Sequence, residues 1–264
     1  MVARGMRIII MTDLEGVCGV YRFEQTREYG TPANMEARRL LMGEINAAVR
    51  GAFDGGATRV VVWDGHDGSK SFLLEELDER AEVVMGVFGQ LDLVFGQGFD
   101  GAFLLGYHSR SHTPRGVLCH TQSSRTWNNY WINDRLAGEI YQEAIVLGAY
   151  DIPVLMVTGD DKTVKEAREF LGDDIVTVQV KIGLAREAAL MYSPKRARAM
   201  IYEGAKEAMK KVGKIKPCKP KFPLKIRWQF KDSGIVDRYR GDAKRIDATT
   251  LEKVVEKPED IKYP

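Results

Sequence analysis

The sequence predicts an α/β fold with a largely parallel central sheet flanked by helices, followed by a smaller C-terminal α+β piece. Short β-branched runs alternate with longer segments in which apolar residues recur at helical spacing. Acidic residues or histidines follow several of these runs, as expected at strand ends. With 264 residues, the chain has room for one large domain and an appendage. We expect a metal-binding catalytic domain at residues 1–192 and a helix-strand region at 193–264.

The elements of the large domain follow from this alternation. The first strand, residues 7–11, contains three consecutive isoleucines, which is typical of a strand buried on both faces. Further apolar runs predict strands at 59–63, 81–85, 102–107, 153–158 and 175–182. Helical periodicity predicts helices at 33–53, 138–149 and 163–171. Strands that alternate with helices form βαβ units and therefore a mainly parallel sheet.

The remaining chain has a different composition. Residues 194–212 have the spacing of one long helix, and residues 206–231 are rich in lysine with three interspersed prolines. We expect a linker there, leading to a strand at 224–230 and a helix near 251–255. The basic stretch is expected to be a solvated surface and not a nucleic-acid site.

Composition excludes several classes of function. Thirty-nine Lys and Arg residues against thirty-seven Asp and Glu residues give a net charge of +2, which does not indicate a nucleic-acid-binding protein. No stretch approaches the roughly 20 apolar residues that cross a bilayer. Three widely spaced cysteines do not form a disulfide framework. We expect a cytoplasmic protein that binds neither membrane nor nucleic acid.

Candidate functional residues follow the predicted strands. Asp13 and Glu15 come after the first strand, His66 after the second and His108 after a later one, while His120 lies in the loop beyond. Ligands of parallel sheets bind outside the carboxyl ends of the strands. Two adjacent carboxylates repel each other unless a cation lies between them or one is protonated. Carboxylates together with imidazoles favour Zn²⁺ or a similar transition metal, and a bridging carboxylate is typical of two-metal hydrolases. Each residue alone is also compatible with a structural role.

A series of motifs resembles the zinc D-aminopeptidase (DppA) family. The motifs occur in order over roughly residues 7–162 and together are more specific than any single one. They are Thr12-Asp13-Leu14-Glu15-Gly16, Asp64-Gly65-His66, Leu105-Gly106-Tyr107-His108, Thr113-Pro114, His120, Ile132-Asn133-Asp134-Arg135 followed by Gly138-Glu139, and the segment 153–161.

The resemblance implies a cytoplasmic aminopeptidase that releases N-terminal, D-configured residues from short peptides through a water molecule activated by two zinc ions per subunit. It also implies a ring-shaped homo-oligomer, a decamer in this family. Carried over by position, Asp13 bridges the zinc ions, and His120 is the catalytic histidine. The other implied ligands are Glu15, His66, His108 and Glu139. Which of these four serves which ion stays open.

Two alternatives remain at this stage. The same metals could act on another amide or ester, or the chain could be a ring-forming scaffold with a structural metal site. The loop between His108 and His120 is one residue longer than the family pattern and contains an additional histidine, His112, which we expect at the surface. The resemblance does not extend clearly beyond residue 182, so the preference for D or L residues is open.

Overall fold

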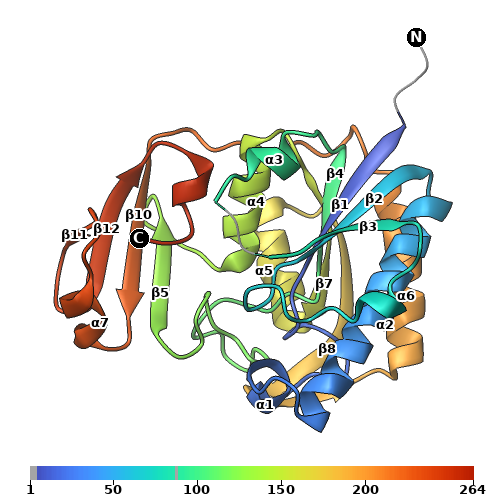
Figure 1. The fold of residues 1–264 in the computed structure, drawn as a ribbon, viewed down its shortest axis with the longest axis horizontal. Helices are drawn as coiled ribbons and strands as arrows, with labels where there is room; N and C mark the ends of the chain where they lie inside the picture. Colours follow the sequence, from blue (N-terminus) through green and yellow to red (C-terminus); the bar gives the residue numbers. More distant parts are fainter. Residues whose placement is uncertain (1–4, 87–88) are drawn as a thin grey trace.

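Two sheets form the frame of the molecule in the computed structural model, which describes residues 5–86 and 89–264 (Figure 1). Among these residues, the larger sheet has seven strands in the order β3-β2-β1-β4-β7-β8-β9. All neighbouring pairs are parallel except β8 and β9. The strands are β1 (Met6–Thr12), β2 (Ala57–Asp64), β3 (Ala81–Val84), β4 (Gly101–Leu105), β7 (Val154–Asp160), β8 (Val176–Ala185) and β9 (Ala188–Met191). The predicted fold class is confirmed.

The order of the strands creates a switch point between β1 and β4. The chain first runs outward from β1 to β2 and β3, and then continues on the other side of β1 with β4. The connections that follow β1 and β4 therefore lead to opposite faces of the sheet, and a crevice forms outside the strand ends at this point. In open α/β sheets this crevice is where ligands bind.

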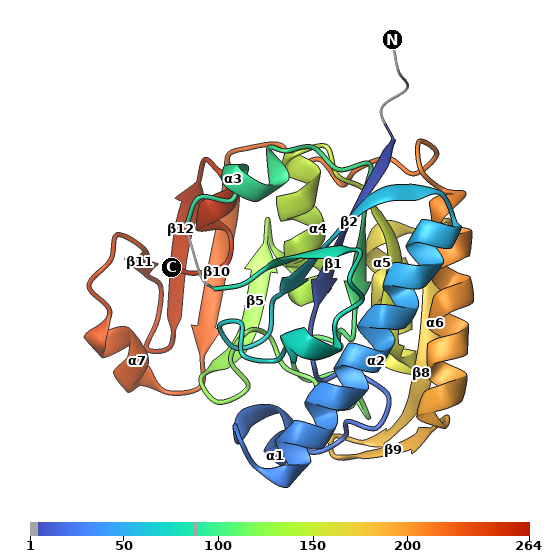
Figure 2. The same cartoon turned by 45° about the vertical axis from the view of Figure 1, so that its right-hand side comes forward.

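Helices cover both faces of the large sheet (Figure 2). Helices α2 (Pro32–Asp54) and α6 (Pro194–Met209) pack on one face, and α4 (Glu139–Ala149) and α5 (Asp161–Leu171) on the other. Local signals set their starts. Thr31 and Ser193 accept hydrogen bonds from the backbone N–H groups of Asn34 and Arg196, and a proline occupies the first turn of both helices.

The smaller sheet is antiparallel and packs on the far side of α4 (Figure 1). Its order is β11-β12-β10-β5-β6. Trp228 of β10 and Tyr130 of β5 are fully buried in the core that this sheet shares with α4. The strands are β5 (Trp127–Ile132), β6 (Arg135–Leu136), β10 (Leu224–Phe230), β11 (Lys244–Arg245) and β12 (Thr250–Val255).

The prediction of a helix near 251–255 is wrong. This segment is strand β12, which pairs antiparallel with β10 from Leu224 to Gln229. Leu251 and Val255 are apolar and four residues apart, a spacing that fits one face of a helix and also one face of a strand. The strand forms because β10 has an edge free for pairing. The strand β5 was not predicted and pairs with the other edge of β10. The division into domains at residue 193 stays a prediction. Helix α6, which begins just after that boundary, packs on α2 beside the large sheet.

Short elements complete the described chain. They are α1 (Phe23–Arg27), α3 (Asp92–Phe95), α7 (Ser233–Arg238) and the 3₁₀ turns η1 (Leu74–Glu76) and η2 (Pro258–Asp260). Of the helices in the described residues, none combines the length and the apolar character needed to cross a membrane.

Candidate metal centre

Residues that follow the C-terminal ends of three neighbouring strands of the large sheet lie close together. Asp13 follows β1, His66 follows β2 and His108 follows β4, on either side of the switch point. Glu15 lies two residues beyond Asp13. All four side chains are buried. Ionisable groups are rarely buried without partners, so this cluster needs an electrostatic explanation.

Two glycines allow the loops after β1 and β4 to lie against each other. The N–H of Gly16 donates to the carbonyl oxygen of Gly106 over 2.7 Å. Gly106 has φ +75°, and a Cβ atom there would lie 2.3 Å from the carbonyl oxygen of Asp13. Only glycine combines this backbone conformation with such a close approach. The glycines in the two sequence motifs therefore position the carboxylate beside His108.

The carboxylate of Asp13 faces two separate groups of ligand atoms. Its Oδ1 lies 2.9 Å from Nδ1 of His66, and its Oδ2 lies 3.3 Å from Nε2 of His108. The Oε2 of Glu15 approaches the same His66 nitrogen at 3.1 Å. Asp13, Glu15 and His66 thus form one group, whose ligand atoms all lie within 4.8 Å of one another.

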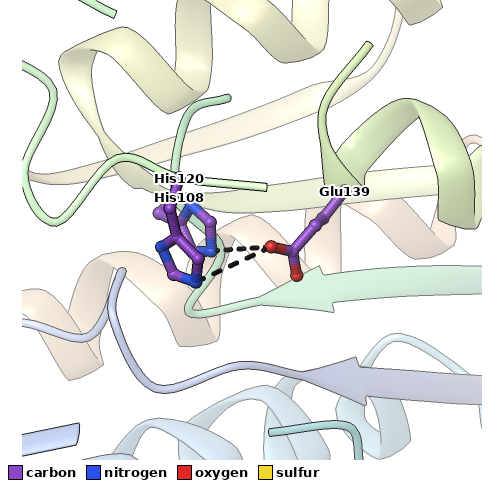
Figure 3. A group of neighbouring side chains, drawn as sticks. All are labelled: His108, His120 and Glu139. Atoms are coloured by element: carbon purple, nitrogen blue, oxygen red, sulfur yellow. Dashed lines mark ion pairs between the residues drawn. The ribbon is translucent and has the colours of Figure 1, made fainter. Parts of the chain in front are cut away.

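The second group lies at the start of helix α4 (Figure 3). Glu139 is the first residue of this helix, and its Oε1 lies 3.2 Å from Nε2 of His108 and 3.9 Å from Nε2 of His120. The rings of His108 and His120 are stacked, with centroids 4.0 Å apart. The N–H of Gln122 donates to Glu139 Oε1 and helps to fix the carboxylate. The ligand atoms of His108, His120 and Glu139 also lie within 4.8 Å of one another.

Backbone carbonyls set the protonation of the three imidazoles. His66 directs Nε2 at the carbonyl of Thr26 (3.0 Å), His108 directs Nδ1 at that of Ser109 (3.0 Å), and His120 directs Nδ1 at that of Leu118 (2.8 Å). A carbonyl oxygen only accepts, so these nitrogens carry the hydrogen. The other nitrogen of each ring faces the cluster, and once that nitrogen is deprotonated its lone pair is placed to bind a metal. This arrangement is typical of metal-ligating histidines.

Several buried atoms at the centre have no hydrogen bond among the described residues. They are Asp13 Oδ2, Glu15 Oε2 and His108 Nε2. Their nearest polar neighbours lie 3.1 to 3.3 Å away without forming a hydrogen bond. Buried unpaired acceptors are costly, and a cation between them removes that cost. A set of imidazole nitrogens and carboxylate oxygens is suited to zinc.

The electrostatics of the cluster also favour added positive charge. Burial alone would raise the pKa of Glu15, but the surrounding histidines, His66 first, outweigh it and hold the pKa well below its usual value. Burial would lower the pKa of His66, but Glu15 and Asp13 raise it well above its usual value. Burial, and next the charge of Glu15, raise the pKa of Asp13 to about 7. The site therefore draws in cationic charge.

Comparisons with known proteins extend over nearly the whole chain and agree with a zinc site. The profile of the Peptidase_M55 family, D-aminopeptidase, matches residues 6–262. The chain belongs to this family. A D-aminopeptidase of Bacillus subtilis (strain 168) is 35% identical over 218 residues, which cover 81% of this chain and 78% of that protein. The structure also resembles the Zn-dependent D-aminopeptidase DppA from Bacillus subtilis, a self-compartmentalizing protease, with a TM-score of 0.89 and 30% identity over 97% of this chain and 94% of that one.

Membership of the D-aminopeptidase family confirms the resemblance and the aminopeptidase class predicted from the sequence. All six predicted site residues lie in the two groups around Asp13. The individual roles given to them stay predictions. His120, predicted as catalytic, lies in the group with His108 and Glu139, and its free Nε2 faces Glu139. His112 is exposed, as expected, and contacts Asn128.

Sequence reasoning missed Lys181, which supports the site in this D-aminopeptidase-family chain. Its buried Nζ donates to the carbonyl oxygens of Glu15, Val17 and Val20 over 2.6, 2.9 and 2.6 Å. One ammonium group therefore holds the whole loop after β1. The sequence gives no clear signal for it, because Lys181 occupies a polar position in a run where apolar and polar residues alternate, after Thr177 and Gln179.

The two groups open onto a cavity of about 700 Å³. Its lining includes Asp13, Glu15, His66, His120 and Glu139 from the metal centre. Lys262 and Tyr263 of the C-terminal segment also line the cavity, where Lys262 pairs with Glu143 and the hydroxyl of Tyr263 donates to Gln122. A space of this size accepts a short peptide or another small molecule.

Proposed function

We propose that the site binds two zinc ions and releases the N-terminal residue, in the D configuration, from short peptides. The observation that carries this proposal is the position of the Asp13 carboxylate, whose two oxygens face two separate groups of ligand atoms. One carboxylate that serves two ions is typical of hydrolases with paired metals. The relationship to a Zn-dependent D-aminopeptidase supports zinc and the D configuration.

We assign Glu15 and His66 to one zinc ion and His108 and Glu139 to the other, with Asp13 shared. When bound, the zinc ions would supply Lewis-acid polarisation of the scissile carbonyl and a water molecule of lowered pKa. The bound ions would also satisfy the unpaired atoms of Asp13, Glu15 and His108. These side chains follow the ends of β1, β2 and β4 or begin α4, so the packed frame of the sheet positions the ligand set.

His120 is proposed to exchange a proton with the substrate. Its Nδ1 hydrogen is held by the carbonyl of Leu118, so the ring orientation is fixed and Nε2 is the reactive nitrogen. The ring of Phe23 lies edge-on to it, with centroids 6.2 Å apart. A histidine held in this way is suited to accept a proton from the attacking water and to return it to the leaving amine.

The oligomeric assembly is proposed from the relationship to the family. The relative described as a self-compartmentalizing protease supports a ring-shaped homo-oligomer for this chain, with ten subunits as the expected number. Analytical ultracentrifugation of the zinc-loaded protein tests this number. A monomer would contradict the ring. A cytoplasmic location stays a prediction.

The proposed activity is tested on one purified sample. Elemental analysis counts zinc per chain, and D-Ala and L-Ala p-nitroanilides and short alanyl peptides are assayed before chelation, after chelation and after return of zinc. About two zinc ions per chain and chelator-sensitive release of N-terminal D-alanine are expected. Two zinc ions without cleavage of any peptide would contradict the aminopeptidase proposal. A preference for L-alanine would contradict the proposed configuration alone.

A further inference from the structure

Two arginines on the wall of the cavity lack an ion pair within the described part of the chain. Arg27 is the last residue of α1, the short helix below the large sheet in Figure 1, and Arg125 lies on the turn before β5. Both line the cavity that contains the metal centre. Neither forms an ion pair with a residue of the described chain, whereas the third basic residue of the lining, Lys262, pairs with Glu143.

Arg27 is tied directly to the metal centre. The carbonyl of the preceding residue, Thr26, accepts the Nε2 hydrogen of the proposed ligand His66. The guanidinium carbon of Arg27 lies 3.4 Å from the centroid of the Phe23 ring, and the same ring contacts His120. The flat face of the Arg27 guanidinium therefore packs on the Phe23 ring. The N–H groups in the guanidinium plane stay free for a ligand.

One of these N–H groups is already desolvated. The Nε atom of Arg27 is buried and has no hydrogen-bond partner among the described residues. Two acidic side chains act on Arg27 electrostatically but form no ion pair with it: Glu15 of the metal centre, and Glu187, which accepts the backbone N–H of Phe23 at 3.1 Å. A buried donor without a partner is unfavourable unless a ligand supplies the acceptor.

Arg125 is presented from a fixed turn. Lys231 donates to the carbonyl of Ser124 over 2.8 Å, and the N–H of Gln122, three residues before Arg125, donates to Glu139. Burial, and next the charge of Arg125, lower the pKa of Arg27. The two cations thus repel each other, and an anion between them would relieve the repulsion.

We propose that Arg27 and Arg125 bind the C-terminal carboxylate of a short peptide and thereby select substrates whose free carboxylate lies close to the scissile bond. This inference rests on the proposed function, because it assigns the substrate of the same site. A guanidinium donates two parallel hydrogen bonds to a carboxylate, which gives both orientation and affinity. A longer peptide carries its carboxylate further from the scissile bond, and a peptide amide has no carboxylate at all.

The test compares a dialanine of the configuration that the enzyme cleaves with its C-terminal amide. The zinc-loaded enzyme is expected to prefer the free acid. In Arg27→Gln and Arg125→Gln, the ratio of kcat/KM for acid over amide is expected to fall roughly 10- to 100-fold, mainly through KM. Arg22→Gln is the matched control, since Arg22 directly precedes the same short helix, is exposed and does not line the cavity.

The outcomes separate this inference from the proposed function. Equal cleavage of acid and amide by the unaltered enzyme would overturn carboxylate binding and leave the aminopeptidase intact. An equal loss on both substrates in Arg27→Gln, with zinc content unchanged, would show a structural role and also overturn it. Competition of the acid by inorganic phosphate but no preference for acid over amide would show a general anion site. Cleavage of neither compound would contradict the proposed function itself.

Discussion

The imidazole of His120 stacks on that of His108, with an angle of 13° between the ring planes. The two rings share Glu139 as a neighbour, but only His108 also contacts Asp13. This difference separates His108, which contacts the carboxylate shared by the two groups, from His120, which contacts only Glu139 of the second group. It leads to opposite expectations for the two substitutions.

His120→Ala is expected to retain both zinc ions and to lower kcat by about 100-fold or more, the usual effect of losing a proton-transfer group. His108→Ala is expected to lose zinc as well as activity. Elemental analysis and steady-state kinetics on both variants provide the measurement, and the exposed His112→Ala is the control. Loss of one zinc ion in His120→Ala would identify His120 as a ligand and not as the proton-transfer group.

Asp13→Ala is expected to release both zinc ions, because each oxygen of Asp13 faces one of the two groups. Glu15→Ala removes an oxygen from one group only, and it is expected to retain about one ion per chain. Metal content after dialysis distinguishes the two results. Asp174→Ala, an exposed carboxylate in the loop before β8, is the control. Two equivalents of zinc in Asp13→Ala would exclude the bridging role.

Lys181→Met is expected to destabilise the protein by about 3 kcal/mol or more, because three buried carbonyl groups lose a charged donor. Since one of them belongs to Glu15, zinc affinity is also expected to fall. Denaturant unfolding of the zinc-free protein and a zinc titration measure the two effects separately. The exposed Lys214→Met is the control. An unchanged free energy of unfolding would show that Lys181 is not needed to hold the loop.

Glu44 on α2 is expected to make stability depend on pH. Burial raises its pKa from 4.5 to about 7, and its Oε2 has no hydrogen-bond partner among the described residues. A pKa raised by folding favours the protonated form, so this contribution to stability is present below the unfolded pKa and is lost as the pH rises through 7. The loss amounts to about 3 kcal/mol at most.

Glu44→Gln is expected to remove this dependence, since its amide oxygen can still accept the N–H of Cys18. Thermal unfolding at about pH 5 and about pH 8 should show a smaller difference in Tm for the variant than for the unaltered protein. Glu36→Gln, on the exposed face of the same helix, should behave as the unaltered protein does. Identical pH profiles for Glu44→Gln and the unaltered chain would contradict a perturbed Glu44.

Much of the fold could be predicted from the sequence because the signals for its strands and helices lie within a few residues. The apolar run before Asp13 and the Thr31-Pro32 start of α2 are both present within a few residues. The alternation of strands and helices then determines a parallel sheet, and its strand ends identify Asp13, His66 and His108 as neighbours. The ordered motifs added Glu139 and His120, which strand spacing alone did not distinguish from structural residues.

The tertiary structure decided what depends on distant segments. Leu251–Val255 is a strand only because β10 offers an unpaired edge, and the partner of Trp228 in the core, Tyr130, comes from a part of the chain almost a hundred residues away. The same holds for the site. The approach of Lys181 to the loop after Asp13, and the meeting of Arg27 with Arg125 at one cavity, join segments whose spacing in the sequence has no period. Periodicity reports on local backbone geometry, whereas these contacts arise from packing between layers.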